Sequence, residues 1–118
     1  MKDCLDILVI DDDEEDRMNV QNLLDNEGMK AVVHEASDCS SGIEKMKSSN
    51  IDCVLIDHRL PGTNGVEVLE KLREVNRNNV PLILLTGVGD ELLAAEVMKK
   101  GASDYLPKNG LNGKTLAH

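Results

Sequence analysis

The stretch ILVIDDDEEDR, residues 7–17, runs from four aliphatic side chains directly into six acids and an arginine. The aliphatic run predicts a buried strand, because short continuous apolar segments rich in Ile and Val are typical of strands. Six neighbouring acids repel one another, so we expect a cationic partner where this strand ends. The stretch therefore predicts both the central strand of the fold and a site beside it.

Further strand and helix patterns follow the opening strand in strict alternation. Strands are predicted at 5–10, 31–35, 53–56, 81–85 and, more weakly, 104–106. Helices are predicted at 14–27, after Asp38, at 65–76 and at 90–100, each with apolar residues on one side. Asp13 is the expected N-cap of the first helix and Gly28 its C-terminal stop.

This alternation predicts the doubly wound α/β class, in which helices cover both faces of a parallel sheet. Ligands of such sheets bind outside the carboxyl ends of the strands. The polar residues expected at those ends are Asp11, Asp12 and Asp13 after the first strand, Asp57 after the third, Thr86 after the fourth and Lys108 after the fifth. Acids, a hydroxyl and an ammonium are thus expected to converge on one edge.

Length and charge limit the classes of function. A chain of 118 residues is long enough for one domain. Its net charge of -9 would repel a phosphate backbone, so direct nucleic-acid binding is not expected. No apolar stretch approaches the length of a membrane span, and the N-terminus lacks the apolar core of a signal peptide. Cys4, Cys39 and Cys53 lack metal-ligand spacing and are interpreted as reduced packing residues, which suits the cytoplasm.

The expected cluster of acids suits metal-dependent phosphoryl chemistry. Carboxylates about 4 Å apart repel by roughly 4 kcal/mol per pair at an effective dielectric near 20, so they take up protons or bind a cation. Mg²⁺ or Mn²⁺ fits one or two carboxylates together with phosphate oxygens. A lysine and a hydroxyl would hold the phosphoryl oxygens, and a carboxylate is the obvious nucleophile. Taken singly, the acids at 11–16 are better explained as a helix cap and first turn, and Lys108 as a solvated amine. The convergence of reactive groups from all four strand ends is what favours a site.

Four motifs together carry a family resemblance. ILVIDDD, VLIDHRLPGTNG, LILLTG and GASDYLPK resemble the receiver domain of two-component response regulators, the CheY-like fold, over residues 5–110. The resemblance implies a flavodoxin-like sheet of five parallel strands in the order 2-1-3-4-5. We expect residues 1–118 to form one receiver domain, excised from or N-terminal to a longer protein. The last helix, expected from Leu111, has only eight residues including His118, so we expect part of the sheet to be uncovered and a homodimer to cover it.

The resemblance implies roles for the acids and for Arg59. Asp57 corresponds to the phosphoacceptor, which takes a phosphoryl group from a sensor histidine kinase, a phosphotransfer protein or a small donor such as acetyl phosphate. Asp12 corresponds to a direct Mg²⁺ ligand and Asp11 to a ligand through water. Arg59 corresponds to the residue that gives the metal its backbone carbonyl.

The resemblance also implies a switch. Thr86 would donate its hydroxyl, and Lys108 its ammonium, to the bound phosphoryl group. Tyr105 would change rotamer as Thr86 moves, carrying the signal to the face around the fourth helix and fifth strand. The side chains of Arg59 and Val88 flank the path of attacking water in the family, and we expect them to set the lifetime of the phosphoryl group.

The function expected is a phosphorylation-activated switch that controls an output domain or a partner protein and catalyses only its own phosphorylation and dephosphorylation. The alternative is a receiver-like binding module that works without phosphorylation, although none of the key residues is missing. A haloacid-dehalogenase-type phosphatase is disfavoured by Glu15, where its motif has threonine. An EF-hand loop fails because Asp16 stands where glycine is required.

Overall fold

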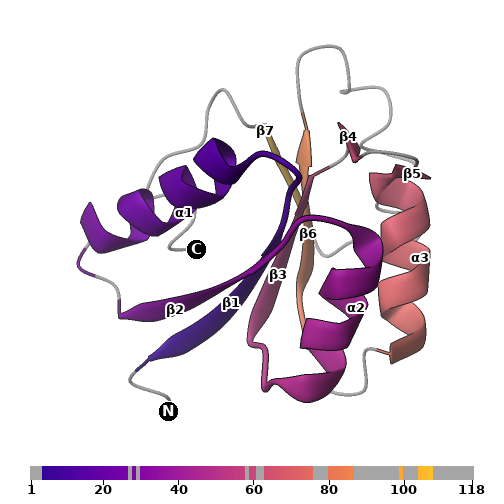
Figure 1. Cartoon of the computed structure of the whole chain (residues 1–118), viewed down its shortest axis with the longest axis horizontal. Coiled ribbons are helices and arrows are strands. Elements are labelled where there is room, and N and C mark those ends of the chain that lie inside the picture. The colour runs from indigo at the N-terminus through magenta and orange to yellow at the C-terminus, as the bar shows by residue number, and fades with distance from the viewer. Residues whose placement is uncertain are drawn as a thin grey trace.

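The computed structural model of the chain (Figure 1) describes residues 4–26, 28, 30–57, 59–60, 63–75, 80–86, 99 and 104–107. A parallel sheet forms its middle layer, with α1 on one side and α2 and α3 on the other. The elements are β1 (Leu5–Ile10), α1 (Glu14–Asn26), β2 (Ala31–Ala36), α2 (Cys39–Ser48), β3 (Cys53–Asp57), β4 (Arg59–Leu60), β5 (Thr63–Asn64), α3 (Gly65–Val75), β6 (Leu82–Thr86) and β7 (Asp104–Pro107). No helix in these ranges is long and apolar enough to cross a membrane.

The strand order confirms the predicted fold class. The sheet has the order β2-β1-β3-β6-β7, and every neighbouring pair is parallel. Since β6 and β7 are the fourth and fifth predicted strands, this is the expected order 2-1-3-4-5. The antiparallel pair β4 and β5 was not predicted. The helix predicted at 90–100 lies outside the described residues except for Lys99, and so does the helix expected from Leu111.

Successive side chains of β1 belong to two separate apolar clusters, because neighbouring residues of a strand point to opposite faces. Leu8 and Ile10 pack in the cluster that contains side chains of α2 and α3. Ile7 and Val9 pack in the cluster that contains side chains of α1. All four residues are buried. The apolar run from Ile7 to Ile10 in β1 is therefore required by burial on both faces, as expected for a parallel strand between two helical layers.

Local capping fixes where the helices begin and end. The backbone N–H of Glu15 donates to Oδ1 of Asp13 at 2.9 Å, so Asp13 caps α1 as predicted. Gly28 has a φ of 72°, the left-handed conformation that commonly ends a helix. Asp38 and Ser41 form a reciprocal capping box at the start of α2.

The cysteines have the chemistry expected of packing residues. All three are free thiols. Burial, followed by the neighbouring charge of Asp52, raises the pKa of the Cys53 thiol to about 11. Burial is also the main cause that raises the pKa of Cys39. Both thiols therefore stay protonated at neutral pH, and both pack against the core clusters.

The buried Gly42 lets α2 approach β1 closely. A Cβ atom at this position would lie 2.6 Å from Cδ1 of Ile10 and 3.0 Å from its Cγ1. Ile10 is fully buried, so its side chain has little room to move away. The close packing of α2 on the sheet thus depends on the absence of a side chain at Gly42.

We expect Gly42→Ala to lower the free energy of unfolding by about 1 kcal/mol. Overpacking of about 1–3 kcal/mol outweighs the gain in helix propensity of about 1 kcal/mol. Ile10→Val removes Cδ1, so Gly42→Ala should be less destabilising in the Ile10→Val background than in wild type. Urea unfolding of the four proteins measures this coupling, and equal effects in both backgrounds would contradict the packing argument.

Candidate functional site

Three acids from two neighbouring strand ends meet at the carboxyl edge of the sheet. One carboxylate oxygen from each of Asp11, Asp12 and Asp57 lies within 4.8 Å of the other two. Asp11 is 1% and Asp57 6% exposed, whereas Asp12 is exposed. Ile10 pairs with Ile56 across β1 and β3, so Asp11 and Asp57 are the next residues on adjacent strands. The strand order reverses between these two strands, where ligands of such folds bind.

Several hydrogen bonds fix the turn that carries Asp11. Its backbone N–H donates to the carbonyl of Ala36 at 3.0 Å. Its Oδ1 accepts from the N–H of Asp13 at 3.0 Å, and its carbonyl accepts from Nη1 of Arg17 at 2.6 Å. The backbone N–H, the carbonyl and the side chain of Asp11 are thus all held by neighbouring residues.

The donor set suits a hard divalent cation. Three carboxylates at this separation repel one another, and two of them are withdrawn from water. Mg²⁺ and Mn²⁺ prefer oxygen ligands, and Mg²⁺ usually retains several waters. The exposed Asp12 leaves a side of the cluster open to such waters. The acidic cluster, defined here as Asp11, Asp12 and Asp57, therefore fits the predicted metal.

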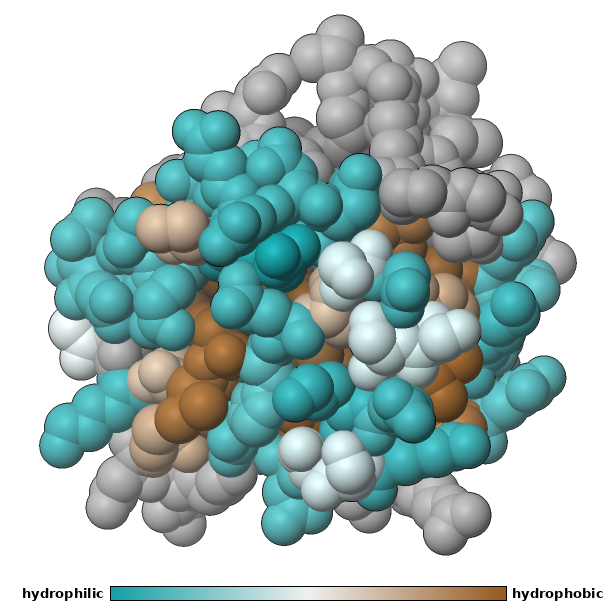
Figure 2. All heavy atoms as spheres, viewed as in Figure 1, coloured by the Kyte–Doolittle hydropathy of each residue, from teal (hydrophilic) through white to brown (hydrophobic). Residues whose placement is uncertain are grey.

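The other acids of residues 7–17 lie at the start of α1 and outside the acidic cluster. Glu14, Glu15 and Asp16 form the first turn of α1, where negative charge interacts favourably with the helix dipole. Hydrophilic residues predominate on the outer surface of α1 on the face shown in Figure 2. Asp13 caps the helix. None of these four belongs to the acidic cluster.

The backbone positions of two further predicted residues are consistent with the site. Thr86 is the last residue of β6, and Leu85 before it pairs with Asp57. Thr86 therefore ends its strand at the same edge as the acids. Arg59 begins β4 two residues after Asp57. The side chains of Thr86 and Arg59 are not among those that the structure describes.

For the remaining predicted residues, the structure describes only a backbone position or nothing. Tyr105 pairs with Leu84 across β6 and β7, and only its backbone is described. Val88 and Lys108 lie outside the described residues. The roles assigned to these three side chains stay predictions.

The sequence analysis missed Arg17, which was quoted but given no role. Its guanidinium bonds the carbonyl of Asp11 and, through Nε, Oε1 of Glu35 on β2 at 3.0 Å. Both partners are brought near by the fold, from the turn before α1 and from a strand 18 residues along the chain. The only available signal was the position of Arg17 one turn after the Asp13 cap, which places it near the start of α1.

Comparison with known proteins gives a consistent family. The model of the response regulator receiver domain matches residues 7–117. The transcriptional regulatory protein FixJ of Bradyrhizobium diazoefficiens is 35% identical over 102 residues, covering 86% of this chain and 48% of that protein. The transcriptional regulatory protein SrrA of Staphylococcus aureus is 35% identical over 103 residues, covering 87% of this chain and 41% of that protein. The chain thus spans about half of the length of FixJ and somewhat less than half of the length of SrrA.

Solved structures show the same fold. A response regulator receiver domain protein from Clostridium thermocellum has a TM-score of 0.83 and 32% identity, covering 96% of this chain and 88% of that one. Full-length FixJ from B. japonicum has a TM-score of 0.81 and 33% identity, covering 95% of this chain and 53% of that one.

Asp12→Asn should abolish the stabilisation of the protein by Mg²⁺. Wild type should gain about 2.7 kcal/mol of unfolding free energy at 100 times its Kd for Mg²⁺, whereas the variant should gain little. Without metal the variant should melt at a higher temperature than wild type, because one repelling charge is gone. Thermal melts with and without MgCl₂ measure both effects.

Glu14→Gln is the matched control, since it removes one acid from the same stretch but outside the cluster. Its response to Mg²⁺ should equal that of wild type. A full Mg²⁺ response in Asp12→Asn would contradict the assignment of Asp12 to the metal site.

Proposed function

Because the chain belongs to the response regulator receiver domain family, we propose that it is a switch activated by Mg²⁺-dependent phosphorylation of Asp57. One observation carries the proposal: the carboxylate of Asp57 is buried at the carboxyl edge of the sheet, within 4.8 Å of Asp11 and Asp12. A phosphoacceptor needs a carboxylate beside a cation site that neutralises the incoming phosphoryl oxygens.

The reaction proposed is a phosphoryl transfer. A carboxylate oxygen of Asp57 attacks the phosphorus of a phosphohistidine or of acetyl phosphate. The bond from phosphorus to the leaving nitrogen or oxygen breaks as the acyl phosphate forms. The electron pair stays on the leaving group, an imidazole that takes up a proton or an acetate. Mg²⁺, when bound, neutralises charge on the phosphoryl oxygens.

The chain's own residues divide the remaining work. Asp11, Asp12 and the backbone carbonyl of Arg59 would hold the cation beside Asp57. Thr86 and Lys108 would donate hydrogen bonds to the phosphoryl oxygens, as charge-assisted bonds do in other phosphoryl sites. The position of Thr86 at the end of β6, one residue beyond the partner of Asp57, supports its part.

The proposed output is a change of population. To move a resting ratio of 1:99 to 99:1, phosphorylation must favour the active state by about 5.5 kcal/mol. New hydrogen bonds to Thr86 and Lys108, followed by a rotamer change of Tyr105, would supply the bias. The proposed readers are an output domain or effector protein, with a homodimer as one form of the active state. A sensor histidine kinase or phosphotransfer protein is the proposed donor, acting in the cytoplasm.

The second candidate is a binding module that keeps this fold but works without phosphorylation. It would need the same surface and strand order but no reactive Asp57. The complete acidic cluster favours the switch, because two buried acids beside a third are unfavourable unless a cation or proton compensates them.

Incubation with Mg²⁺ and acetyl phosphate should add one phosphoryl group to wild type and none to Asp57→Asn, as measured by intact-protein mass spectrometry. Asp25→Asn, which neutralises an exposed acid in the last turn of α1, is the matched control and should be labelled like wild type. If wild type gains no phosphoryl group from acetyl phosphate or from a phosphohistidine donor protein, the binding module is the better account.

Arg59→Asn and Val88→Glu should each shorten the lifetime of the phosphoryl group several-fold. A shorter side chain at position 59, two residues after Asp57, opens the path for water. A carboxylate at position 88, two residues after Thr86, can orient the attacking water. The rate of loss of the phosphoryl mass after donor removal measures this. Rates equal to wild type in both variants would exclude a role for these positions.

A further inference from the structure

Arg17 ties α1 to the turn that carries the acids and to the edge strand β2. Its Nη1 donates to the carbonyl of Asp11 at 2.6 Å and its Nε to Oε1 of Glu35 at 3.0 Å. The Arg17 side chain is 15% exposed, whereas that of Glu35 is 50% exposed. We propose that Arg17 is a positioning residue, which sets the affinity of the acidic cluster for Mg²⁺ by fixing the peptide unit between Asp11 and Asp12. The inference rests on the proposed metal site.

The bonded carbonyl is what makes Arg17 relevant to the metal. The carbonyl of Asp11 belongs to the planar peptide unit that joins Asp11 to Asp12. The direction of this carbonyl fixes the rotation of the peptide unit. That rotation in turn sets the position from which the Asp12 side chain starts. Asp12 is exposed, so packing does little to orient its carboxylate. The bond from Arg17 therefore helps to determine the separation between two acids of the cluster.

Two other bonds of the turn act on the neighbouring peptide units. The N–H of Asp11 is held by the carbonyl of Ala36, and the N–H of Asp13 by Oδ1 of Asp11. These two bonds act on the peptide units before Asp11 and after Asp12. The unit between the two acids is bonded through its carbonyl to Arg17.

Glu35 orients the guanidinium. An ion pair with one half-exposed partner contributes little to stability by itself. Its geometric effect is larger, because the guanidinium is a rigid fork and holding Nε directs Nη1 toward the carbonyl. A lysine at this position has a single ammonium on a flexible stem and loses the fork.

A role for Arg17 through its charge and a role through positioning predict opposite changes in Mg²⁺ affinity when Arg17 is removed. The positive charge of a guanidinium bonded to this turn attracts the acids of the cluster and opposes the binding of a further cation. If Arg17 acted only through its charge, its removal would tighten Mg²⁺ binding. If it positions the acids, its removal weakens Mg²⁺ binding. The sign of the change therefore separates the two effects.

The test is a titration of the whole chain with MgCl₂, followed through backbone amide NMR shifts. Arg17→Met keeps an apolar stem and removes the donors, and should raise the Kd for Mg²⁺ roughly 10-fold, the lower end for loss of a residue that orients metal ligands. Arg17→Lys keeps the charge and should fall between Arg17→Met and wild type. Glu35→Gln removes the charge of the ion pair but keeps an Oε1 acceptor for Nε of Arg17. It should therefore change the Kd less than Arg17→Met.

A measurement without metal checks the proposed cause. In metal-free Arg17→Met the amides of Asp12 and Asp13 should exchange with solvent faster than in wild type, while those of β3 should not. A Kd equal to or lower than wild type in Arg17→Met overturns the proposal. If that variant does not fold, the same result in Arg17→Lys overturns it.

The outcomes also separate this inference from the proposed function. Weaker Mg²⁺ binding in Arg17→Met supports the positioning role even if wild type accepts no phosphoryl group. A wild type that binds no Mg²⁺ overturns the metal site and the positioning role together.

Discussion

Two buried carboxylates at the ends of neighbouring parallel strands are the constraint on which the rest of the site depends. Asp11 and Asp57 follow paired residues of β1 and β3, so the strand pairing that builds the core also brings the two charges together. Charges withdrawn from water in this way are unfavourable without a compensating proton or cation. The fold thus holds a repulsive arrangement in place through apolar burial, which no local segment of the chain would maintain by itself.

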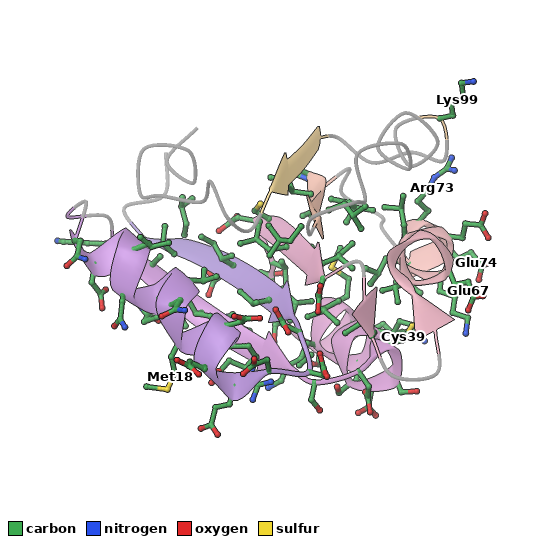
Figure 3. The ribbon with its side chains drawn as sticks, turned by 90° about the horizontal axis from the view of Figure 1, so that it is seen from above. Met18, Cys39, Glu67, Arg73, Glu74 and Lys99 are labelled. Atoms are coloured by element: carbon green, nitrogen blue, oxygen red, sulfur yellow. The ribbon has the colours of Figure 1, made fainter. Side chains whose placement is uncertain are left out.

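Residues around the acidic cluster hold Asp11 and Asp57 in place, while Asp12 stays exposed to solvent. The apolar clusters on the two faces of the sheet hold β1 and β3, while hydrogen bonds to Asp11 define the turn above them. Seen from above in Figure 3, α1 and the pair α2 and α3 flank the sheet, and the labelled Met18 and Cys39 come from α1 and α2. Met18 is 56% exposed, so α1 also presents one large apolar side chain to solvent.

Much of this fold could be predicted from the sequence because its signals are local. Continuous apolar runs mark β1, β3 and β6, and a cap at Asp13 and a glycine at Gly28 bound α1. The convergence of the acids followed from strand polarity, since all parallel strands end at one edge. The strand order itself came from family resemblance rather than from the residues.

Other features could not be predicted because they depend on contacts distant in sequence or on very short elements. The bonds of Arg17 join α1 to β2 and to the preceding turn, and no spacing rule predicts such a bridge. The pair β4 and β5 has two residues in each strand, too few for any periodicity to be read. The close approach at Gly42 likewise depends on Ile10, a residue of another element.

The alternation of β1 has a consequence for how this chain can vary. Asp11 continues the series of Ile7 and Val9, whose side chains pack toward α1, and Asp57 continues that of Cys53 and Leu55 on the same face. A single inserted or deleted residue in either strand would therefore turn an acid toward α2 and α3 while turning core residues the wrong way. The same alternation of side chains along these strands places both the core residues and the acids. A one-residue shift of register that displaces the acids therefore also takes core residues out of the core and destabilises the fold.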